Sequence, residues 1–218
     1  MWAAVEEYLD GLQIEPDAAL EAALEASAAA GLPEIAVTPS QGKLLQLLTR
    51  MVGAKRILEI GTLGGVSTIW LARALAPRGR VVTLEADREH FEVARANFAR
   101  AGLAKRIDQR LGRALETLPR LEAEGGAAFD FVFIDADKEN TVPYFDWALR
   151  LSRPGAAILV DNVVRDGEIV APGSRDARIR GMRRFHESLR QEKRVSAATI
   201  QTVGSKGYDG FTLAVVLR

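Results

Sequence analysis

Two strand-like apolar runs, each ending in oxygen-bearing side chains, constrain this chain more than any other feature. The run Phe129–Ile134 leads into Asp135, and the run Ala156–Val160 leads into Asp161 and Asn162. Runs of this kind, without internal Pro or Gly, are typical of parallel strands that are buried on both faces. Ligands of open α/β sheets bind beyond the carboxyl ends of such strands. The hard oxygen atoms there predict a site for Mg²⁺, Ca²⁺ or Mn²⁺.

This metal-site interpretation has one geometric condition and one alternative. Asp161 and Asn162 are adjacent, so in a continuing strand their side chains would point to opposite faces of the sheet. Both can bind one cation only if the strand ends at this point. The alternative is that Asp135 and Asp161 cap the helices that follow the strands.

From Arg56 onward, short strand-like segments alternate with helical ones, which predicts βαβ units and a parallel sheet. The expected strands are 56–60, 81–84, 107–111, 129–134 and 156–160. The expected helices between them are 67–76, 88–101, 114–123 and 142–151. The fold class is therefore α/β, with helices on both faces of a mostly parallel sheet.

The two ends of the chain differ from this alternating middle part. Residues 1–50 contain helical signals only, including a stop at Gly31 and Pro33 and a new start near Thr38. A charged helix over 176–191 precedes runs at 195–203 and 211–217, which we interpret as a terminal hairpin joined by residues 204–210. We expect one domain over 1–218, with a helical cap over 1–50 and a catalytic core over 51–218.

Composition excludes several classes of function. The 29 basic and 29 acidic residues give no net charge, which argues against a nucleic-acid partner. The chain has no cysteine and only two histidines, so thiolate nucleophiles, cysteine zinc sites and multi-histidine metal sites are excluded. No apolar stretch reaches the roughly 18 residues of a membrane span, and the acidic N-terminus does not match a secretory signal. We expect a cytoplasmic protein with no membrane partner.

A glycine-containing loop follows the first expected strand. The sequence Glu59-Ile60-Gly61-Thr62-Leu63-Gly64-Gly65-Val66-Ser67 lets the backbone approach a ligand but does not match the GxGxxG motif of dinucleotide sites. Glu85 ends the second strand, where an acid can bind ribose hydroxyls. Glu59, a carboxylate inside an apolar strand, needs a polar partner or a ligand. A nucleoside ligand without phosphates fits this pattern best.

Several motifs together resemble one family. They are Thr38-Pro39-Ser40-Gln41-Gly42-Lys43, Leu58-Glu59-Ile60-Gly61-Thr62, Asp135-Ala136-Asp137-Lys138-Glu139-Asn140, Asp161-Asn162-Val163 and Asp209-Gly210-Phe211-Thr212. Over residues 35–218 the chain resembles the cation-dependent class I O-methyltransferases of the catechol and caffeoyl-CoA type, which use S-adenosylmethionine (SAM). The resemblance implies a Rossmann-like, seven-stranded sheet whose last strand is antiparallel.

The resemblance also implies roles for individual residues. Asp135, Asp161 and Asn162 would hold a divalent cation, with Mg²⁺ preferred, and Lys138 with Asp135 would be catalytic. The residues expected to bind SAM are Glu59, Gly61, Thr62, Gly65, Ser67, Glu85, Ala86, Gly112, Arg113, Ala114 and Asp135. The expected partners are a small phenolic acceptor and, by analogy with the family, a second copy of the chain.

The chain also departs from the family pattern at several places. Arg113 stands where an acidic residue is common, and His186 where asparagine is usual. After Lys138-Glu139-Asn140, family members often have an aromatic residue, whereas this chain has Thr141-Val142-Pro143. Residues 204–208 differ from the usual short approach to the last strand. Most of these differences concern the acceptor side of the site.

The predicted function is transfer of a methyl group from SAM to a hydroxyl of a small catechol-like acceptor. A phenol with a pKa of about 10 is mostly protonated at neutral pH, so a cation would stabilise the phenolate and Lys138 would take the proton. For Lys138 the alternative is a surface residue at a helix start. For the protein, the alternative is a methyltransferase of the same fold acting on a macromolecule or a non-catechol metabolite, attracted by the basic segment 175–194. A nicotinamide-dependent oxidoreductase and a non-catalytic interaction protein fit the residues less well.

Overall fold

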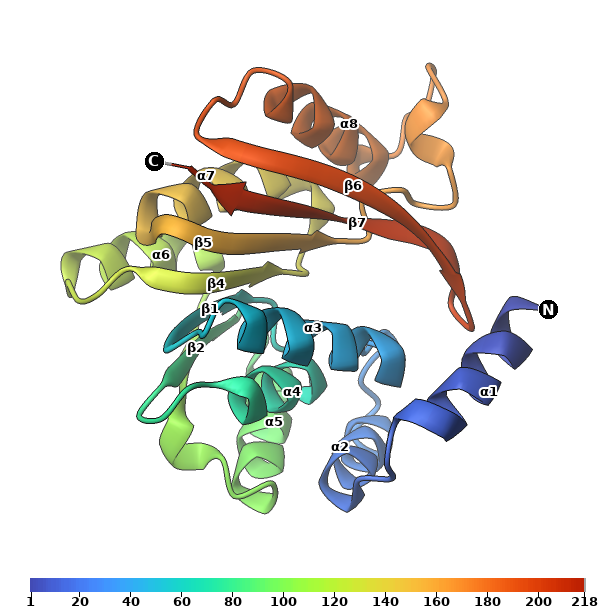
Figure 1. Ribbon diagram of the computed structural model, residues 1–218, viewed down its shortest axis with the longest axis vertical. Coiled ribbons are helices and arrows are strands. Elements are labelled where there is room, and N and C mark those ends of the chain that lie inside the picture. Colours follow the sequence, from blue (N-terminus) through green and yellow to red (C-terminus); the bar gives the residue numbers. More distant parts are fainter. Residues whose placement is uncertain (218) are drawn as a thin grey trace.

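The computed structural model describes residues 1–217, and within them seven strands form one sheet in the order β3-β2-β1-β4-β5-β7-β6 (Figure 1). Every pair from β3 to β5 is parallel, and β7 runs antiparallel to both β5 and β6. The strands are β1 (Arg56–Ile60), β2 (Arg80–Glu85), β3 (Ile107–Leu111), β4 (Phe129–Ile134), β5 (Ser152–Asp161), β6 (Val195–Gly204) and β7 (Gly207–Val216). The predicted fold class is confirmed.

The helices follow the predicted boundaries closely because local caps fix where they begin. They are α1 (Trp2–Gln13), α2 (Ala18–Ala29), α3 (Pro39–Met51), α4 (Val66–Ala74), α5 (Arg88–Arg100), α6 (Ala114–Ala123), α7 (Thr141–Leu151) and α8 (Ala177–Leu189), with 3₁₀ turns η1 (Ala104–Arg106), η2 (Lys138–Asn140) and η3 (Glu168–Val170). The Asp17 carboxylate accepts hydrogen bonds from backbone amides at the start of α2. Thr38 and Gln41 form a reciprocal capping box at the start of α3.

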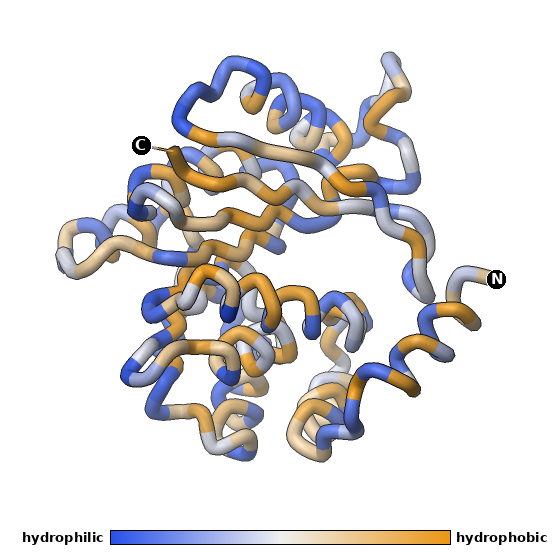
Figure 2. The backbone as a smooth tube through the Cα atoms, viewed as in Figure 1, coloured by the Kyte–Doolittle hydropathy of each residue, from blue (hydrophilic) through white to orange (hydrophobic). Residues whose placement is uncertain are grey.

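Helices cover both faces of the sheet, and each face has its own hydrophobic core. On one face, Leu118 of α6, Phe145 of α7 and Phe185 of α8 pack against the strands. On the other face, α3, α4 and α5 cover the sheet, α2 packs against α4 and α5, and Trp70 of α4 and Phe98 of α5 are buried there. The tube in Figure 2 shows the central strands as continuous hydrophobic segments, as expected for strands buried on both faces.

Two strands, β5 and β7, begin four residues before their predicted starts. Strand β5 begins at Ser152, because residues before Ala156 still pair with β4 across an irregularity in the register. The hairpin pairing continues to Gly204 and Gly207, so the loop expected over 204–210 shortens to a turn at Ser205 and Lys206. This shortening moves Lys206 to the tip of a long hairpin.

Helix α1 lies at the edge of the molecule, next to the tip of that hairpin (Figure 1). The backbone amide of Ser205 donates a hydrogen bond to the Glu6 carboxylate, 2.5 Å away. None of the α1 side chains is buried. Among residues 1–217, no helix is long and apolar enough to cross a membrane. The cytoplasmic location stays a prediction.

Candidate active site

A cavity of about 600 Å³ opens at the carboxyl ends of β1, β2, β4 and β5, where ligands of such sheets bind. Most of the residues predicted to bind the donor or the cation line it. The predicted residues along its wall are Gly61, Thr62, Ser67, Glu85, Ala86, Gly112, Ala114, Asp135, Lys138 and Asn162. The structure therefore brings together side chains that lie up to about a hundred residues apart in the sequence.

Four other predicted residues are not part of this wall. Gly65 precedes α4 with a left-handed backbone and faces the ring of Phe98. Arg113 precedes α6, and Glu59 and Asp161 are buried within or at the end of their strands. Direct contact of Glu59, Gly65 and Arg113 with a donor stays a prediction.

The loop after β1 depends on glycine at position 61. Gly61 has a φ of +99°, and a Cβ atom there would lie 2.0 Å from the backbone oxygen of Asp135. Only glycine combines this backbone conformation with such a close approach. The loop therefore passes directly over the end of β4, which brings the predicted donor loop beside the predicted cation ligand.

Glu85 organises the same loop from β2. One of its oxygens accepts hydrogen bonds from the backbone amides of Thr62 and Leu63, at 3.2 and 2.8 Å. The Nδ1 atom of His90, in the first turn of α5, lies 3.7 Å from the other oxygen. The Glu85 carboxylate still lines the cavity, where it can accept hydrogen bonds from a ribose.

Glu59 is fully buried, and its carboxylate forms hydrogen bonds with neighbouring side chains. Ser67 donates a hydrogen bond of 2.7 Å and Thr83 one of 2.6 Å to its carboxylate, and Thr68 donates a further one. Burial raises the pKa of Glu59 to about 7, although these hydrogen bonds oppose the shift. Ser67 lines the cavity, so its hydrogen bond to the buried Glu59 fixes the orientation of a side chain in the cavity wall.

Replacing Glu59 with glutamine is expected to change how stability depends on pH. The folded protein holds a proton on Glu59 up to about pH 7, whereas the unfolded chain releases it near the ordinary glutamate pKa of 4.5. This contribution to stability is complete below pH 4.5 and is lost as the pH rises to 7, by about 1.4 kcal/mol per pH unit at most. Urea unfolding of both proteins at pH 4.5, 6 and 8 should show a smaller decline for Glu59→Gln.

The control for this experiment is glutamine at the exposed Glu34. That variant should keep the pH dependence of the parent protein. Identical pH profiles for the parent and Glu59→Gln would contradict the assignment of a buried, protonated Glu59.

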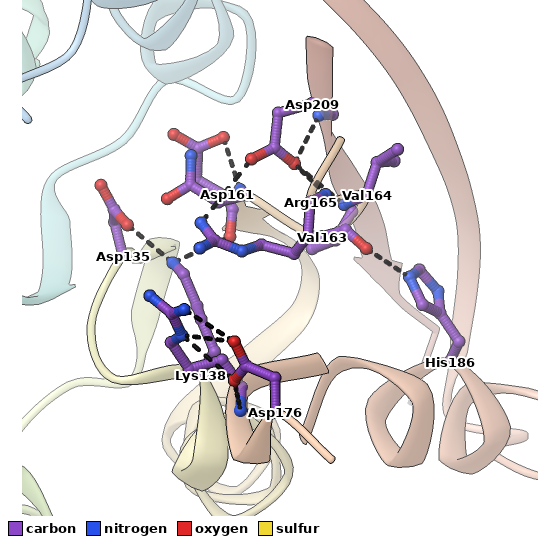
Figure 3. Close-up of polar contacts among 12 residues, drawn as sticks. Asp135, Lys138, Asp161, Val163, Val164, Arg165, Asp176, His186 and Asp209 are labelled. Atoms are coloured by element: carbon purple, nitrogen blue, oxygen red, sulfur yellow. Dashed lines mark hydrogen bonds and ion pairs between the residues drawn. The ribbon is translucent and has the colours of Figure 1, made fainter. Parts of the chain in front are cut away.

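The opposite end of the cavity gathers two carboxylates and one buried lysine (Figure 3). Lys138 is only 8% exposed, so its interpretation as a surface residue is wrong. Its Nζ atom donates hydrogen bonds to Asp135 Oδ1 at 2.8 Å and to the backbone oxygen of Asp161 at 3.1 Å. A Cβ atom on Gly181 of α8 would lie 2.2 Å from the Lys138 backbone oxygen, so glycine lets α8 press against this turn.

The condition for joint binding by Asp161 and Asn162 is met. Strand β5 ends at Asp161, and Asn162 adopts a left-handed backbone with a φ of +54°. The alternative helix-capping role is wrong for both aspartates. The 3₁₀ turn η2, which follows β4, is preceded by Asp137 and not by Asp135. The Asp161 carboxylate accepts a hydrogen bond of 2.8 Å from the backbone amide of the adjacent Asn162, which does not begin a helix.

The donor set at this end suits a hard divalent cation. Burial, together with the nearby negative charge of Asp135, raises the pKa of Asp161 to about 7, while Lys138 opposes the shift. A cation would relieve this repulsion. Within residues 1–217, no group of three or more Asp, Glu, His or Cys side chains is arranged to bind a metal. The candidate ligands are therefore two carboxylates and one amide oxygen, from Asp135, Asp161 and Asn162, which are the hard oxygen donors that Mg²⁺ and Ca²⁺ prefer. The binding itself stays a prediction.

Sequence reasoning missed several residues that line the cavity. They are His90, Tyr144, Arg165 and Arg178. A signal for His90 does exist in the sequence, since it lies five residues after Glu85, the acid that ends β2. The charged helix predicted over 176–191 is α8, which buries Ile179, Met182 and Phe185 on one face, and Arg178 at its start reaches the cavity. His186 is structural, since its Nε2 lies 3.0 Å from the Val163 backbone oxygen.

Comparison with known proteins supports the same chemistry. The family model described as O-methyltransferase matches residues 13–216. The chain belongs to the O-methyltransferase family. It is similar to the catechol O-methyltransferase of Mycobacterium tuberculosis, with 55% identity over 97% of this chain and 94% of that protein.

Two solved structures of O-methyltransferases are also similar throughout. The enzyme from Bacillus cereus, in complex with SAH, has a TM-score of 0.97 and 56% identity over 99% of this chain and 98% of that chain. TomG from Streptomyces achromogenes, involved in tomaymycin synthesis and solved with SAM, has a TM-score of 0.96 and 52% identity over 100% and 97% of the two chains. The predicted family and the predicted class, a SAM-dependent O-methyltransferase, are confirmed.

Proposed function

We propose that this enzyme transfers the methyl group of SAM to a hydroxyl of a small catechol, with a divalent cation, preferably Mg²⁺, held by Asp135, Asp161 and Asn162. The observation that carries the proposal is the meeting of two carboxylates, one amide and a buried lysine beside the glycine-containing loop. The name of the similar M. tuberculosis protein supports a catechol acceptor.

One end of the cavity suits the methyl donor, and the other end suits the acceptor. The loop from Gly61 to Gly64, held by Glu85, suits the donor, because it offers a close backbone approach and a carboxylate for the ribose. The residues after β4 and β5 suit the acceptor. Since the Gly61 backbone lies against Asp135, the two substrates would meet at this junction. Such placement contributes to rate by orienting the reacting groups.

The chemistry requires a deprotonated acceptor oxygen in line with the methyl group. A bound divalent cation would supply Lewis-acid stabilisation of a phenolate. We infer that Lys138 takes the phenolic proton, and the burial of its amine in the cavity wall supports this role. Asp135 orients that amine through its 2.8 Å hydrogen bond. The Asp161 backbone oxygen accepts a second hydrogen bond from the same amine and further restricts its orientation.

Methyl transfer to a panel of catechols tests this proposal directly. We expect turnover with SAM and Mg²⁺. EDTA should lower the rate by at least about a hundredfold, since metal activation contributes several kcal/mol. Excess Mg²⁺ should restore it. If calorimetry shows SAM binding but no catechol is methylated, the acceptor is a macromolecule or a non-catechol metabolite. Activity that EDTA leaves unchanged would remove the cation from the mechanism.

The same proposal includes a homodimer. Helix α1 exposes Trp2, Tyr8 and Leu12, and exposed apolar side chains on one element commonly mark a protein interface. Sedimentation at micromolar concentration should give twice the chain mass of 23.7 kDa. A mass of one chain would overturn this part of the proposal.

A further inference from the structure

One arginine in the acceptor end of the cavity has hydrogen-bonding capacity left over. Arg165 and Arg178 both line the cavity. Arg178 already forms a close pair with Asp176, with its Nη2 atom 2.6 Å from a carboxylate oxygen. Arg165 is different. Its Nη1 atom lies 3.9 Å from Asp209, which is beyond hydrogen-bond distance, and its Nε atom is buried without a partner among residues 1–217.

The backbone around Arg165 is held in an unusual conformation. Asn162, Arg165 and Asp166 have φ values of +54°, +55° and +55°, which is costly for residues other than glycine. Such conformations persist where the surrounding structure enforces them, and they concentrate at functional sites. Here the enforcing group is Asp209, whose Oδ1 atom accepts from the Val164 amide at 2.9 Å and the Arg165 amide at 2.8 Å.

This arrangement fixes Arg165 relative to the proposed cation ligands. Only two residues separate it from Asn162, and Val163 donates a backbone hydrogen bond of 3.0 Å to the Gly210 oxygen of β7. The loop is thus tied to the sheet on both sides of Val164. In Figure 3 the Arg165 side chain extends from this loop back toward Asp161 and Lys138. The guanidinium therefore lies in the same cavity wall as Asp135 and Asn162, where it can contact a ring substituent of a molecule held there.

A second cation approaches the same end from the hairpin tip. Lys206 donates a hydrogen bond to the backbone oxygen of Ala36, which lines the cavity. Burial lowers the pKa of Lys206, and the negative charges of Asp135, Asp161 and Glu6 oppose that shift. If a divalent cation compensates Asp135 and Asp161, then Lys138 and Lys206 are relieved of those two negative charges, and Arg165 keeps only the long ion pair with Asp209.

We propose that Arg165 determines acceptor specificity by binding a carboxylate carried on the catechol ring, so that the preferred acceptors are anionic catechols. A planar guanidinium can form two parallel hydrogen bonds to a carboxylate, which adds both affinity and orientation. This inference rests on the proposed function for the hydroxyl end of the acceptor. It goes beyond that function by naming the substituent at the other end and the residue that recognises it.

The test compares two acceptors of the same shape, 3,4-dihydroxybenzoate and 3,4-dihydroxybenzamide. Only the first carries a negative charge on the ring substituent. For each protein, kcat/KM is measured with SAM and Mg²⁺, and Kd is measured by calorimetry with Mg²⁺ and S-adenosylhomocysteine present. The variants are Arg165→Met, Arg165→Lys and a control, Arg190→Met, at an exposed arginine beyond the end of α8.

We expect the parent enzyme to prefer the acid by about tenfold to a hundredfold, the usual value of a hydrogen bond between charged groups. In Arg165→Met this ratio should fall toward one, mainly through KM. Arg165→Lys should recover part of it, and Arg190→Met should keep the parent ratio. A purely structural role for Arg165 would not produce this pattern.

Two results would overturn the proposal. The first is a parent enzyme that treats the acid and the amide alike. The second is an Arg165→Met variant that loses activity on both by the same factor, since Arg165 would then only hold the loop beside Asn162. If neither catechol is methylated, the proposed function fails, and the calorimetric ratio decides the carboxylate site on its own: a preference for the acid that Arg165→Met removes supports it, and equal Kd values in the parent overturn it.

Discussion

Replacing Asp161 with alanine is expected to lower kcat/KM for a catechol by about a thousandfold, because a cation that contributes several kcal/mol to the reaction loses a ligand. Asp161 is 7% exposed and lies beside Asp135, so its carboxylate is shielded from solvent and close to a second negative charge. SAM binding should change by less than about threefold, since the donor loop and Glu85 are untouched.

Thermal unfolding provides a second readout for this variant. Mg²⁺ should raise the Tm of the parent enzyme, because a ligand that binds only the folded state stabilises it. The Asp161→Ala variant should show little or no shift at the same concentration. The control is Asp146→Ala, an exposed aspartate on α7, which should keep both the activity and the Tm shift. Full activity of Asp161→Ala would remove this residue from the cation site.

The second large effect is expected at Lys138. Methionine preserves much of the length of the side chain but cannot accept or donate a proton. We expect Lys138→Met to lower kcat by about 10²–10³-fold at pH 7.5, within the usual range for loss of a general acid or base. The loss should shrink above about pH 9, because a phenol with a reference pKa of about 10 then ionises without help.

The pH profile separates a role in proton transfer from a role in stability. Lys138 contacts Asp135 and the β5 terminus, so its loss also removes two hydrogen bonds that hold the acceptor end together. Loss of packing alone would lower kcat equally at every pH. A constant ratio between parent and variant from pH 7 to pH 10 would therefore contradict proton transfer by Lys138. An exposed lysine, Lys193, replaced by methionine is the matched control.

The sequence contained enough information for most of the scaffold and half of the site. Alternating apolar runs and helix caps are local signals, so the strands, α2 and α3 could be placed with small errors. The positions of Asp135 and Asp161 followed from one general rule, that ligands bind where parallel strands end. The Ser152 start of β5 was missed because its pairing with β4 is set by a register irregularity between strands.

The roles of Glu59 and Glu85 could only partly be predicted. Both acids were expected to face the donor. The side chain of Glu85 lines the cavity, but Glu59 sits in the middle of β1, where β2 and α4 supply its hydrogen-bonding partners. Whether a buried acid forms hydrogen bonds with a ligand or with neighbouring side chains depends on which elements pack beside it. The sequence of one strand does not contain this information.

The sequence by itself determined that this chain forms a mostly parallel sheet with oxygen-bearing side chains at its carboxyl edge, because strand burial and chain reversal are encoded by residues close together. Only the tertiary structure decided the burial of Lys138, which requires Gly181 of α8 to lie against its turn. It alone also decided the place of Arg165, because Asp209 of β7, 44 residues further along the chain, fixes that loop. Contacts between distant segments have no local sequence pattern, and the acceptor end is built from such contacts.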